Sequence, residues 1–240
     1  MKRLLPALSL LICLFLAAAG CSSALPTLTI AQIPWPDDEV TTYTVQDAEG
    51  SAIGTLELTI QRDDGTYTLT QVVDVTIEGQ QVQDTVSVTA SATDLKPLSM
   101  TETVLFSGQT IEVAATYGEG EVAIVATVDG EEQSATIAIP EDAYDDGEVL
   151  FLLRAIPFQV GYRATYTDVV PAAGLMPEAT VSVAAEEAVE VPAGSFDCYK
   201  IELTVLGTTQ YLWYDTESPH YLVKVEVEGT SMVLTETATP

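Results

Sequence analysis

Cysteine is scarce in this chain: the 240 residues include only Cys13, Cys21 and Cys198. Cys13 lies in an N-terminal segment with the features of a removable signal, and Cys21 follows that segment directly. Because Cys21 is the predicted site of lipid attachment, Cys198 has no partner for an intramolecular disulfide. The fold must therefore be stabilised by a buried core, for which an apolar content of 47% is ample.

Basic residues are also few. The chain has 8 lysines and arginines against 36 aspartates and glutamates, a formal net charge of −28. Such a polyanion repels phosphate groups and has no basic stripe, which excludes nucleic acid as a natural partner. The same charge opposes adsorption to anionic lipid head groups, so contact with a membrane is expected only through a covalent lipid.

Histidine occurs once, at His220, so neither a histidine-rich metal site nor a histidine pair for proton relay can form. The acids are scattered along the chain, and the sequence pattern of an EF-hand calcium loop is missing. Ser195 lacks the Gly-x-Ser-x-Gly context of a nucleophile elbow. We therefore expect no catalytic residues, no metal and no cofactor, and we expect that the chain is not an enzyme.

No apolar run is long enough to cross a membrane. The run from Leu4 to Leu16 falls short of the about 20 residues that a transmembrane helix needs. It follows Lys2 and Arg3 and precedes a box of small residues, Ala-Ala-Gly, that ends directly before Cys21. Residues 1–20 are therefore predicted to be a removed signal peptide and Cys21 to carry the lipid. A plain signal peptide cut after Ala-x-Ala is the alternative.

These features predict an exported protein that is lipid-anchored to the cell membrane or outer envelope and faces outside the cytoplasm. Residues 21–38 contain three prolines around Trp35 and predict a lipidated N-terminus with a short extended tether. Residues 39–240 are predicted to form a single β-rich domain.

Apolar and polar residues alternate along most of this domain. In residues 55–61, for example, Leu56, Leu58 and Ile60 alternate with polar residues, and the next predicted strand, 66–77, follows the hairpin signal Asp63-Asp64-Gly65. Regular spacing with glycine-marked turns predicts an all-β, mainly antiparallel fold. Further strands are predicted over 82–90, 98–106, 110–117, 121–128, 132–138, 160–168, 179–191, 195–206, 208–215, 220–228 and 230–236.

One segment departs from the alternation. Residues 145–156 begin with two aspartates, continue with a dense apolar run and end before Pro157. The aspartates can cap a helix and complement its dipole, and the proline stops it. One short helix near 146–156 is therefore predicted, covering the open end or the concave face of a curved sheet or half-barrel.

Five residues are candidates for the wall of an apolar pocket. Phe151 and Leu152 belong to the predicted helix, and Tyr211, Trp213 and Tyr221 lie on two adjacent predicted strands. Apolar and aromatic side chains line ligand pockets, and core packing is the competing explanation for all five.

Cys198 is predicted to share a strand face with Lys200. A lysine two residues away on the same face would lower the pKa of the thiol a little. An inert thiol at the start of the strand is the alternative.

Three groups of residues carry a resemblance to a known family. Together they resemble domain of unknown function 3108, an uncharacterised bacterial envelope family, over about residues 40–236. The resemblance implies a curved antiparallel sheet with a helix on its concave side, similar to periplasmic lipoprotein carriers, and it brings no established catalytic residues. The residues are Leu153-Arg154-Ala155-Ile156-Pro157 with Gly161-Tyr162, Val191-Pro192-Ala193-Gly194-Ser195-Phe196 with Tyr199-Lys200, and Trp213-Tyr214 with Leu222-Val223-Lys224.

Two functions from different classes remain. The first is a non-catalytic binding module that holds an apolar envelope molecule, such as a lipid, between the sheet and residues 149–156. The alternative is a structural or assembly lipoprotein whose sheet contacts another envelope protein. An apolar cavity would favour the first function, and a filled core with an exposed apolar patch would favour the second.

The lipid anchor gives the first testable prediction. The substitution Cys21→Ser removes the predicted acceptor, so the variant should be released from membranes or remain unprocessed. Membrane fractionation and the mass of the mature N-terminus measure this. A variant that stays on the membrane with the wild-type N-terminus and mass would contradict lipid attachment at Cys21.

Overall fold

The structure is a computed structural model that describes residues 24–238. The predicted signal peptide and Cys21 lie outside the described residues. Within 24–238, no helix combines the length and the apolar character that crossing a membrane requires.

Eight antiparallel strands form the N-terminal half of one large sheet, each joined to the next by a short turn. The predicted hairpin at 63–65 is confirmed: Asp64 and Gly65 both have positive φ, as the turn between two twisted strands requires. The strands are β1 (Asp38–Gln46), β2 (Ala52–Asp63), β3 (Thr66–Ile77), β4 (Gln80–Ser91), β5 (Pro97–Phe106), β6 (Gln109–Gly118), β7 (Glu121–Val128) and β8 (Glu131–Ala138).

Seven strands form the C-terminal half. The short β9 runs parallel to β10, and the other neighbours are antiparallel. The strands are β9 (Ala143–Asp145), β10 (Arg163–Val169), β11 (Glu178–Val191), β12 (Gly194–Val205), β13 (Thr208–Asp215), β14 (Leu222–Val227) and β15 (Thr230–Ala238).

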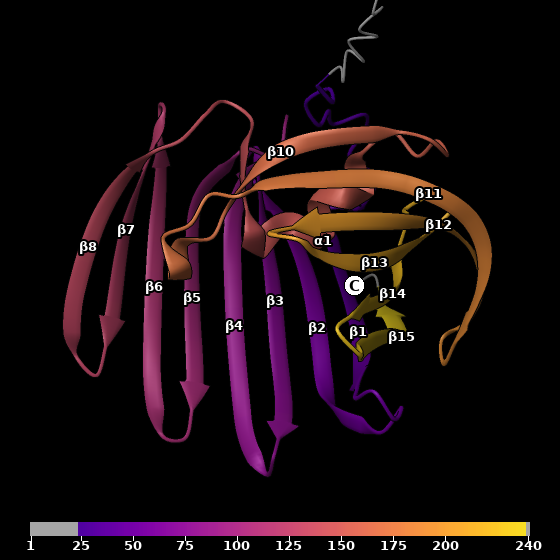
Figure 1. Cartoon of the computed structure of the whole chain (residues 1–240), viewed down its shortest axis with the longest axis horizontal. Helices are drawn as coiled ribbons and strands as arrows, with labels where there is room; N and C mark the ends of the chain where they lie inside the picture. The colour runs from indigo at the N-terminus through magenta and orange to yellow at the C-terminus, as the bar shows by residue number, and fades with distance from the viewer. Residues whose placement is uncertain (1–23, 239–240) are drawn as a thin grey trace, which may run out of the picture.

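Pairing between β1 and β15 joins the two halves, so the sheet has the order β8 to β1 followed by β15 to β9. The C-terminal half curls in front of the N-terminal half, while β4 to β8 extend beyond it as a flatter wing (Figure 1). The predicted all-β curved sheet is therefore confirmed. We call the side of the sheet that faces the other half its inner face.

The predicted short helix near 146–156 is present as three consecutive turns, η1 (Asp146–Glu148), α1 (Val149–Leu152) and η2 (Leu153–Ala155). Asp145 caps η1, as the sequence predicted, and Glu148 completes a capping box with it. The segment lies between the two halves of the sheet (Figure 1). Phe151, Leu152 and Leu153 are completely buried there, which explains the dense apolar run. The remaining helical turn, η3 (Pro171–Ala173), follows β10.

The predicted tether is packed against the domain over most of its described length. The backbone N–H of Leu28 donates to the Thr165 carbonyl at 2.8 Å, and that of Ala31 donates to the Ala155 carbonyl at 2.7 Å. Leu28 and Trp35 are buried. The prolines of this segment favour an extended backbone. Burial of its apolar side chains against the domain is more favourable than leaving them in water, so the segment packs instead of acting as a free spacer.

An ion pair is buried where this segment meets the helical turns. Arg154 donates to both carboxylate oxygens of Glu39 at 2.6 and 3.1 Å and to the Pro219 carbonyl at 2.9 Å. Its guanidinium carbon lies 5.3 Å from the ring centre of Trp35 and 5.6 Å from that of Tyr221. Arg154 and Glu39 are 3% and 2% exposed, so neither charge is screened by water.

Removing one partner of this pair should be costly. Glu39→Gln leaves the Arg154 charge buried without a counter-charge, which should lower the free energy of unfolding by about 3–5 kcal/mol in urea titrations. Asp37→Asn is the matched control, because the Arg62–Asp37 pair is exposed and its loss should cost at most about 1 kcal/mol. Equal effects of the two substitutions would show that burial adds nothing to the Arg154–Glu39 pair.

Candidate functional site

A groove of about 270 Å³ lies on the inner face, where the helical turns meet the two halves of the sheet. Val149 and Leu150 of α1 form one wall of this inner groove. Leu203 of β12, Val225 of β14 and Met232 of β15 contribute apolar side chains from the C-terminal half. The strand register explains this: Val225 pairs with both Leu212 and Met232, so the apolar residues of these strands share one face.

Two carboxylates and two amides also line the inner groove. Asp146 comes from η1 and Asp168 from β10, while Gln71 and Gln210 come from opposite halves of the sheet. Gln71 is held in place because its amide donates to the Gly147 carbonyl at 2.5 Å. The groove thus combines apolar walls with acidic groups, an arrangement typical of sites that orient an amphipathic ligand.

Two further carboxylates are fully buried beside it. Asp145 accepts a hydrogen bond from the Gly147 N–H at 2.9 Å and another from the Tyr117 hydroxyl. Glu148 accepts from the Asp145 N–H at 3.0 Å through one oxygen, and its other oxygen has no partner among the described residues. The capping box therefore brings these acids into the interior, because the turn that it closes is itself buried.

Burial raises the pKa of every acid in this group. The pKa of Asp145 is raised to about 6, that of Asp168 to about 7 and that of Asp146 to about 8. Desolvation is the main cause in each case, and neighbouring carboxylates add to it for Asp146 and Asp168. The pKa of Glu148 is also well above its ordinary value, for the same reason. At neutral pH this group of acids therefore retains protons that carboxyl groups in water would have released.

The five predicted pocket residues do not meet in one groove. Phe151 and Leu152 are completely buried behind Val149 and Leu150, in the core rather than in the groove wall. Tyr221 lies beside Arg154 and does not line the groove.

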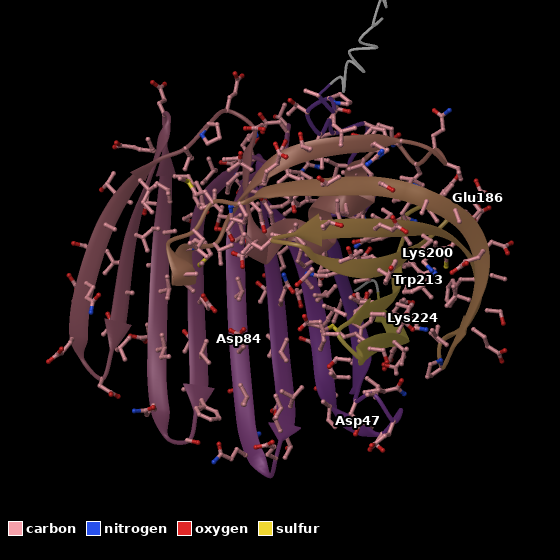
Figure 2. All side chains as sticks on the ribbon, in the orientation of Figure 1. Asp47, Asp84, Glu186, Lys200, Trp213 and Lys224 are labelled. Atoms are coloured by element: carbon pink, nitrogen blue, oxygen red, sulfur yellow. The ribbon has the colours of Figure 1, made fainter. Side chains whose placement is uncertain are left out.

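Tyr211 and Trp213 lie on the outer face of β13, opposite the inner groove. Their register partners on that face are charged: Trp213 is flanked by Lys200 and Lys224, whose ammonium groups lie 4.8 and 5.1 Å from its ring (Figure 2). The indole N–H donates to Glu187 at 2.6 Å. Charged side chains, including Glu187 of β11, thus cover Trp213 on the outer face. Its neighbours along the strand, Leu212 and Tyr214, face the core.

Cys198 does share a face with Lys200, but the predicted effect on its thiol is wrong. Burial, with Asp215 and other acids nearby, raises the pKa of the thiol to about 12. The ammonium of Lys200 is directed instead to the rings of Tyr211 and Trp213. Cys198 is a buried free thiol, and its raised pKa disfavours the thiolate that a nucleophile requires.

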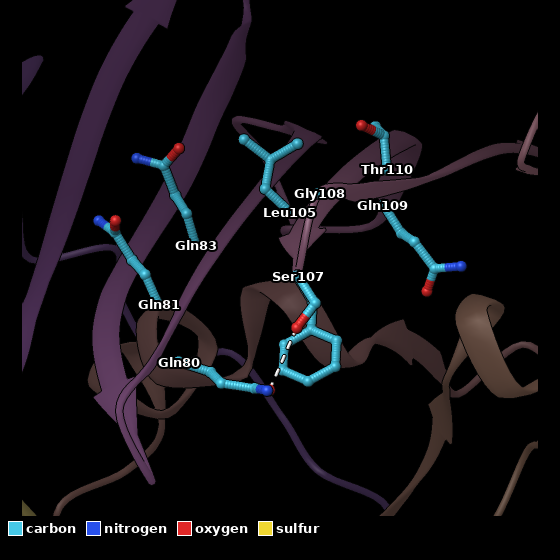
Figure 3. A pocket seen from close by; sticks show the side chains of 9 residues that line it. Gln80, Gln81, Gln83, Leu105, Ser107, Gly108, Gln109 and Thr110 are labelled. Carbon is cyan, nitrogen blue, oxygen red and sulfur yellow. Dashed lines mark hydrogen bonds between the residues drawn. The ribbon is translucent and has the colours of Figure 1, made fainter.

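A second hollow, of about 490 Å³, lies at the end of the wing between β4 and the β5–β6 turn (Figure 3). Glutamines 80, 81 and 83 and the turn residues from Ser107 to Thr110 make up most of its lining. Ser107 donates to the Gln80 side chain at 3.1 Å across it. It contains no titratable group, so the inner groove is the stronger candidate for selective binding.

The residues that the sequence offered as pocket candidates and the residues that line the inner groove come from the same helical segment but are different residues. Asp145 and Asp146 were explained by capping alone, which accounts for their position but not for their burial. Asp168 gave no signal, because it is one polar residue in an alternating strand. A useful signal was that two acids lie immediately before the most apolar run of the domain in the sequence. Among residues 24–238, no group of three or more potential ligands is arranged to hold a metal ion.

The fold and the groove define an antiparallel half-barrel with an acidic, half-apolar groove on its inner face. The chain belongs to the family described as protein of unknown function (DUF3108), whose model matches residues 40–230. No curated protein matches the chain.

Solved structures resemble the fold at low sequence identity. A β-barrel-like protein of domain of unknown function DUF1849 from Brucella abortus has a TM-score of 0.55 and 11% identity, covering 90% of this chain and 99% of its own. A proposed lipoprotein from Parabacteroides distasonis has a TM-score of 0.35 and 14% identity, covering 88% and 99%. A proposed exported protein of YmcC-like fold from Bacteroides fragilis has a TM-score of 0.34 and 11% identity, covering 88% and 100%. These distant matches include a proposed lipoprotein and a proposed exported protein, but only the first structure is similar enough to support the fold.

The raised pKa values predict how stability depends on pH. The folded chain holds the protons of Asp146 and Asp168 more tightly than the unfolded chain does. Their stabilising contribution is complete below the ordinary aspartate pKa of about 4 and is lost as the pH rises through about 7 to 8. The Tm should therefore fall between about pH 5 and about pH 8.5.

Asp168→Asn should flatten this fall and raise the free energy of unfolding at about pH 8 by about 1–4 kcal/mol, because no charge has to be buried. Asp63→Asn removes the same charge from an exposed turn and controls for the general repulsion of this acidic chain. If both variants keep the wild-type slope of Tm against pH, the buried acids do not control it.

Proposed function

We propose that this protein is a lipid-anchored, exported envelope module that binds a small apolar or amphipathic molecule non-catalytically in the inner groove. The observation that carries the proposal is the groove itself, whose apolar walls come from the helical turns and from three strands of the C-terminal half. Its place between the helical segment and the sheet is the place that the sequence predicted for a ligand.

The size of the groove limits the ligand. The groove volume of about 270 Å³ is slightly below the range for small-molecule pockets, roughly 300–1,000 Å³. The core behind it is filled by Phe151 and Leu152, which are completely buried. These features favour one short apolar chain over a lipid with two long chains.

A second function, in structure or assembly, is favoured by the inner face of the wing. Phe106, Ile111 and Val128 are 42%, 38% and 44% exposed, and the register of β5, β6 and β7 places them on the same face. Exposed apolar residues that adjoin one another are typical of protein contact surfaces. This surface would serve the alternative function, contact with another envelope protein.

Filling the groove tests the binding function. Met232 is half-buried in the groove wall, so Met232→Trp should weaken binding of octanol by about tenfold or more in isothermal titration calorimetry, because the indole occupies the ligand volume. Leu206→Trp adds the same side chain at a residue that is 74% exposed and outside the groove, and should leave the affinity unchanged.

Native mass spectrometry of protein purified from its own membrane provides an independent measurement. A co-purified single-chain molecule that is lost in Met232→Trp supports the binding function. Wild-type protein that carries no such molecule and binds no eight-carbon probe, whatever the head group of the probe, would overturn it and favour the structural function.

A further inference from the structure

Three buried polar atoms beside the inner groove have no hydrogen-bond partner among the described residues: the Tyr166 hydroxyl, one oxygen of Glu148 and one oxygen of Asp168. Tyr166 and Glu148 are 0% exposed and Asp168 is 6% exposed. Buried polar groups in folded proteins are almost always hydrogen-bonded, and exceptions concentrate at functional sites. The three atoms therefore call for an explanation in terms of what the groove binds.

The three atoms belong to one region. Tyr166 and Asp168 are two residues apart on β10, so their side chains leave the same face of the strand. The charges of Asp168, Glu148 and Asp146 all act on the Tyr166 hydroxyl, which places it among these acids. Asp146 and Asp168 in turn line the groove, so a ligand in the groove reaches this region directly.

The region is strongly negative, and Lys96, whose charge acts on Glu148, offsets it only in part. Lys96 donates to the Ala143 carbonyl at 3.2 Å and lies 3.7 Å from the ring of Tyr144, and Arg154 is paired with Glu39. No lysine or arginine among the described residues forms an ion pair with Asp146 or Asp168. Asp146 faces the charges of Asp145, Asp168 and Glu102, and Asp168 faces that of Asp145. Glu148 faces Asp145 and Asp168 and, as the one opposing charge, Lys96.

We propose that the inner groove selects a single-chain amphiphile whose head group is a primary ammonium. The ammonium lies between Asp146 and Asp168, with Tyr166 and Glu148 behind them, and the chain lies along Val149, Leu150 and Val225. This assignment rests on the proposed binding function and names the class of ligand.

The chemistry of the ammonium matches the region better than other head groups do. An ammonium has three hydrogen-bond donors and no acceptor, and it therefore complements carboxylate oxygens, which only accept hydrogen bonds. A fatty-acid carboxylate would add a further negative charge to a buried acidic group, which is costly in a medium of low dielectric constant. An alcohol supplies one donor and no charge, so it gains only the contact of its chain with the walls.

Proton release is expected on binding. At neutral pH the acids of this region are partly protonated, because burial raises the pKa of Asp168 to about 7 and that of Asp146 to about 8. A bound cation favours the ionised carboxylates, so the affinity for an ammonium should rise with pH up to about 9. Above that pH the alkylamine itself begins to lose its proton, because its ordinary pKa is about 10.

Titration calorimetry of the full chain with octylamine, octanol and octanoate tests the assignment. In about 0.15 M salt, which screens general attraction to an acidic surface, octylamine should bind at one site per chain. At about pH 8 it should bind about tenfold or more tightly than octanol, as a charge-assisted hydrogen bond provides. Its advantage should shrink at about pH 5.5, and the heat should depend on the ionisation enthalpy of the buffer because protons are released.

Two substitutions connect the selectivity to the groove. Asp168→Asn and the half-buried Asp146→Asn should each lower the affinity for octylamine by about tenfold, with circular dichroism confirming that both variants fold. Asp63→Asn, which removes one exposed charge, should leave this affinity within about twofold.

Each other outcome is decisive. Octanol that binds as tightly as octylamine, or octanoate that binds best, would overturn the ammonium assignment and leave the binding function standing. Loss of octylamine binding in Asp63→Asn to the same extent as in Asp168→Asn would also overturn it, as binding would then follow overall charge. If none of the three probes binds, the binding function itself is wrong.

Discussion

The burial of residues 146–155 between the two halves of the sheet is the constraint on which the rest of the structure depends. Phe151, Leu152 and Leu153 fill the space that the curved sheet encloses, and this apolar burial fixes the distance between the halves. Glu148 and Arg154 of the same segment are carried inside with them. Arg154 therefore needs Glu39, and the capping acids Asp145 and Glu148 become buried carboxyls. The core, the ion pair and the acidic region share this one cause.

The chain has two acidic environments that behave differently. Most of its acids are on the surface, where water and salt screen their charges. Those near the inner groove are removed from water, and burial raises their pKa values into the neutral range. An interior acidic region lowers stability at neutral pH, and such a cost is typical of functional sites rather than of cores built for stability. This contrast, more than the overall charge of −28, is what directs attention to the groove.

Local patterns gave most of the fold in advance. Alternation placed strands β2 to β8 and β10 to β15, because one face of most of these strands is buried and side chains change face at every residue. Strand β1 and the short β9 were not predicted as strands. The packed segment around Trp35 was mistaken for a tether, since prolines signal an extended backbone and say nothing about what the neighbouring apolar side chains contact. Tyr211 and Trp213 lie on the outer face of β13, and their aromatic character does not reveal which face of the strand is turned inward.

The sequence by itself determined the strand pattern and the position and cap of the helical segment. These follow from interactions within a few residues or from composition. Only the tertiary structure decided that β1 pairs with β15, that Arg154 meets Glu39 across 115 residues, and that Asp146 and Asp168 line one groove. Such contacts depend on how the sheet curves and closes around the helical segment. That geometry is set by the packing of the whole core, and no local pattern of residues encodes it.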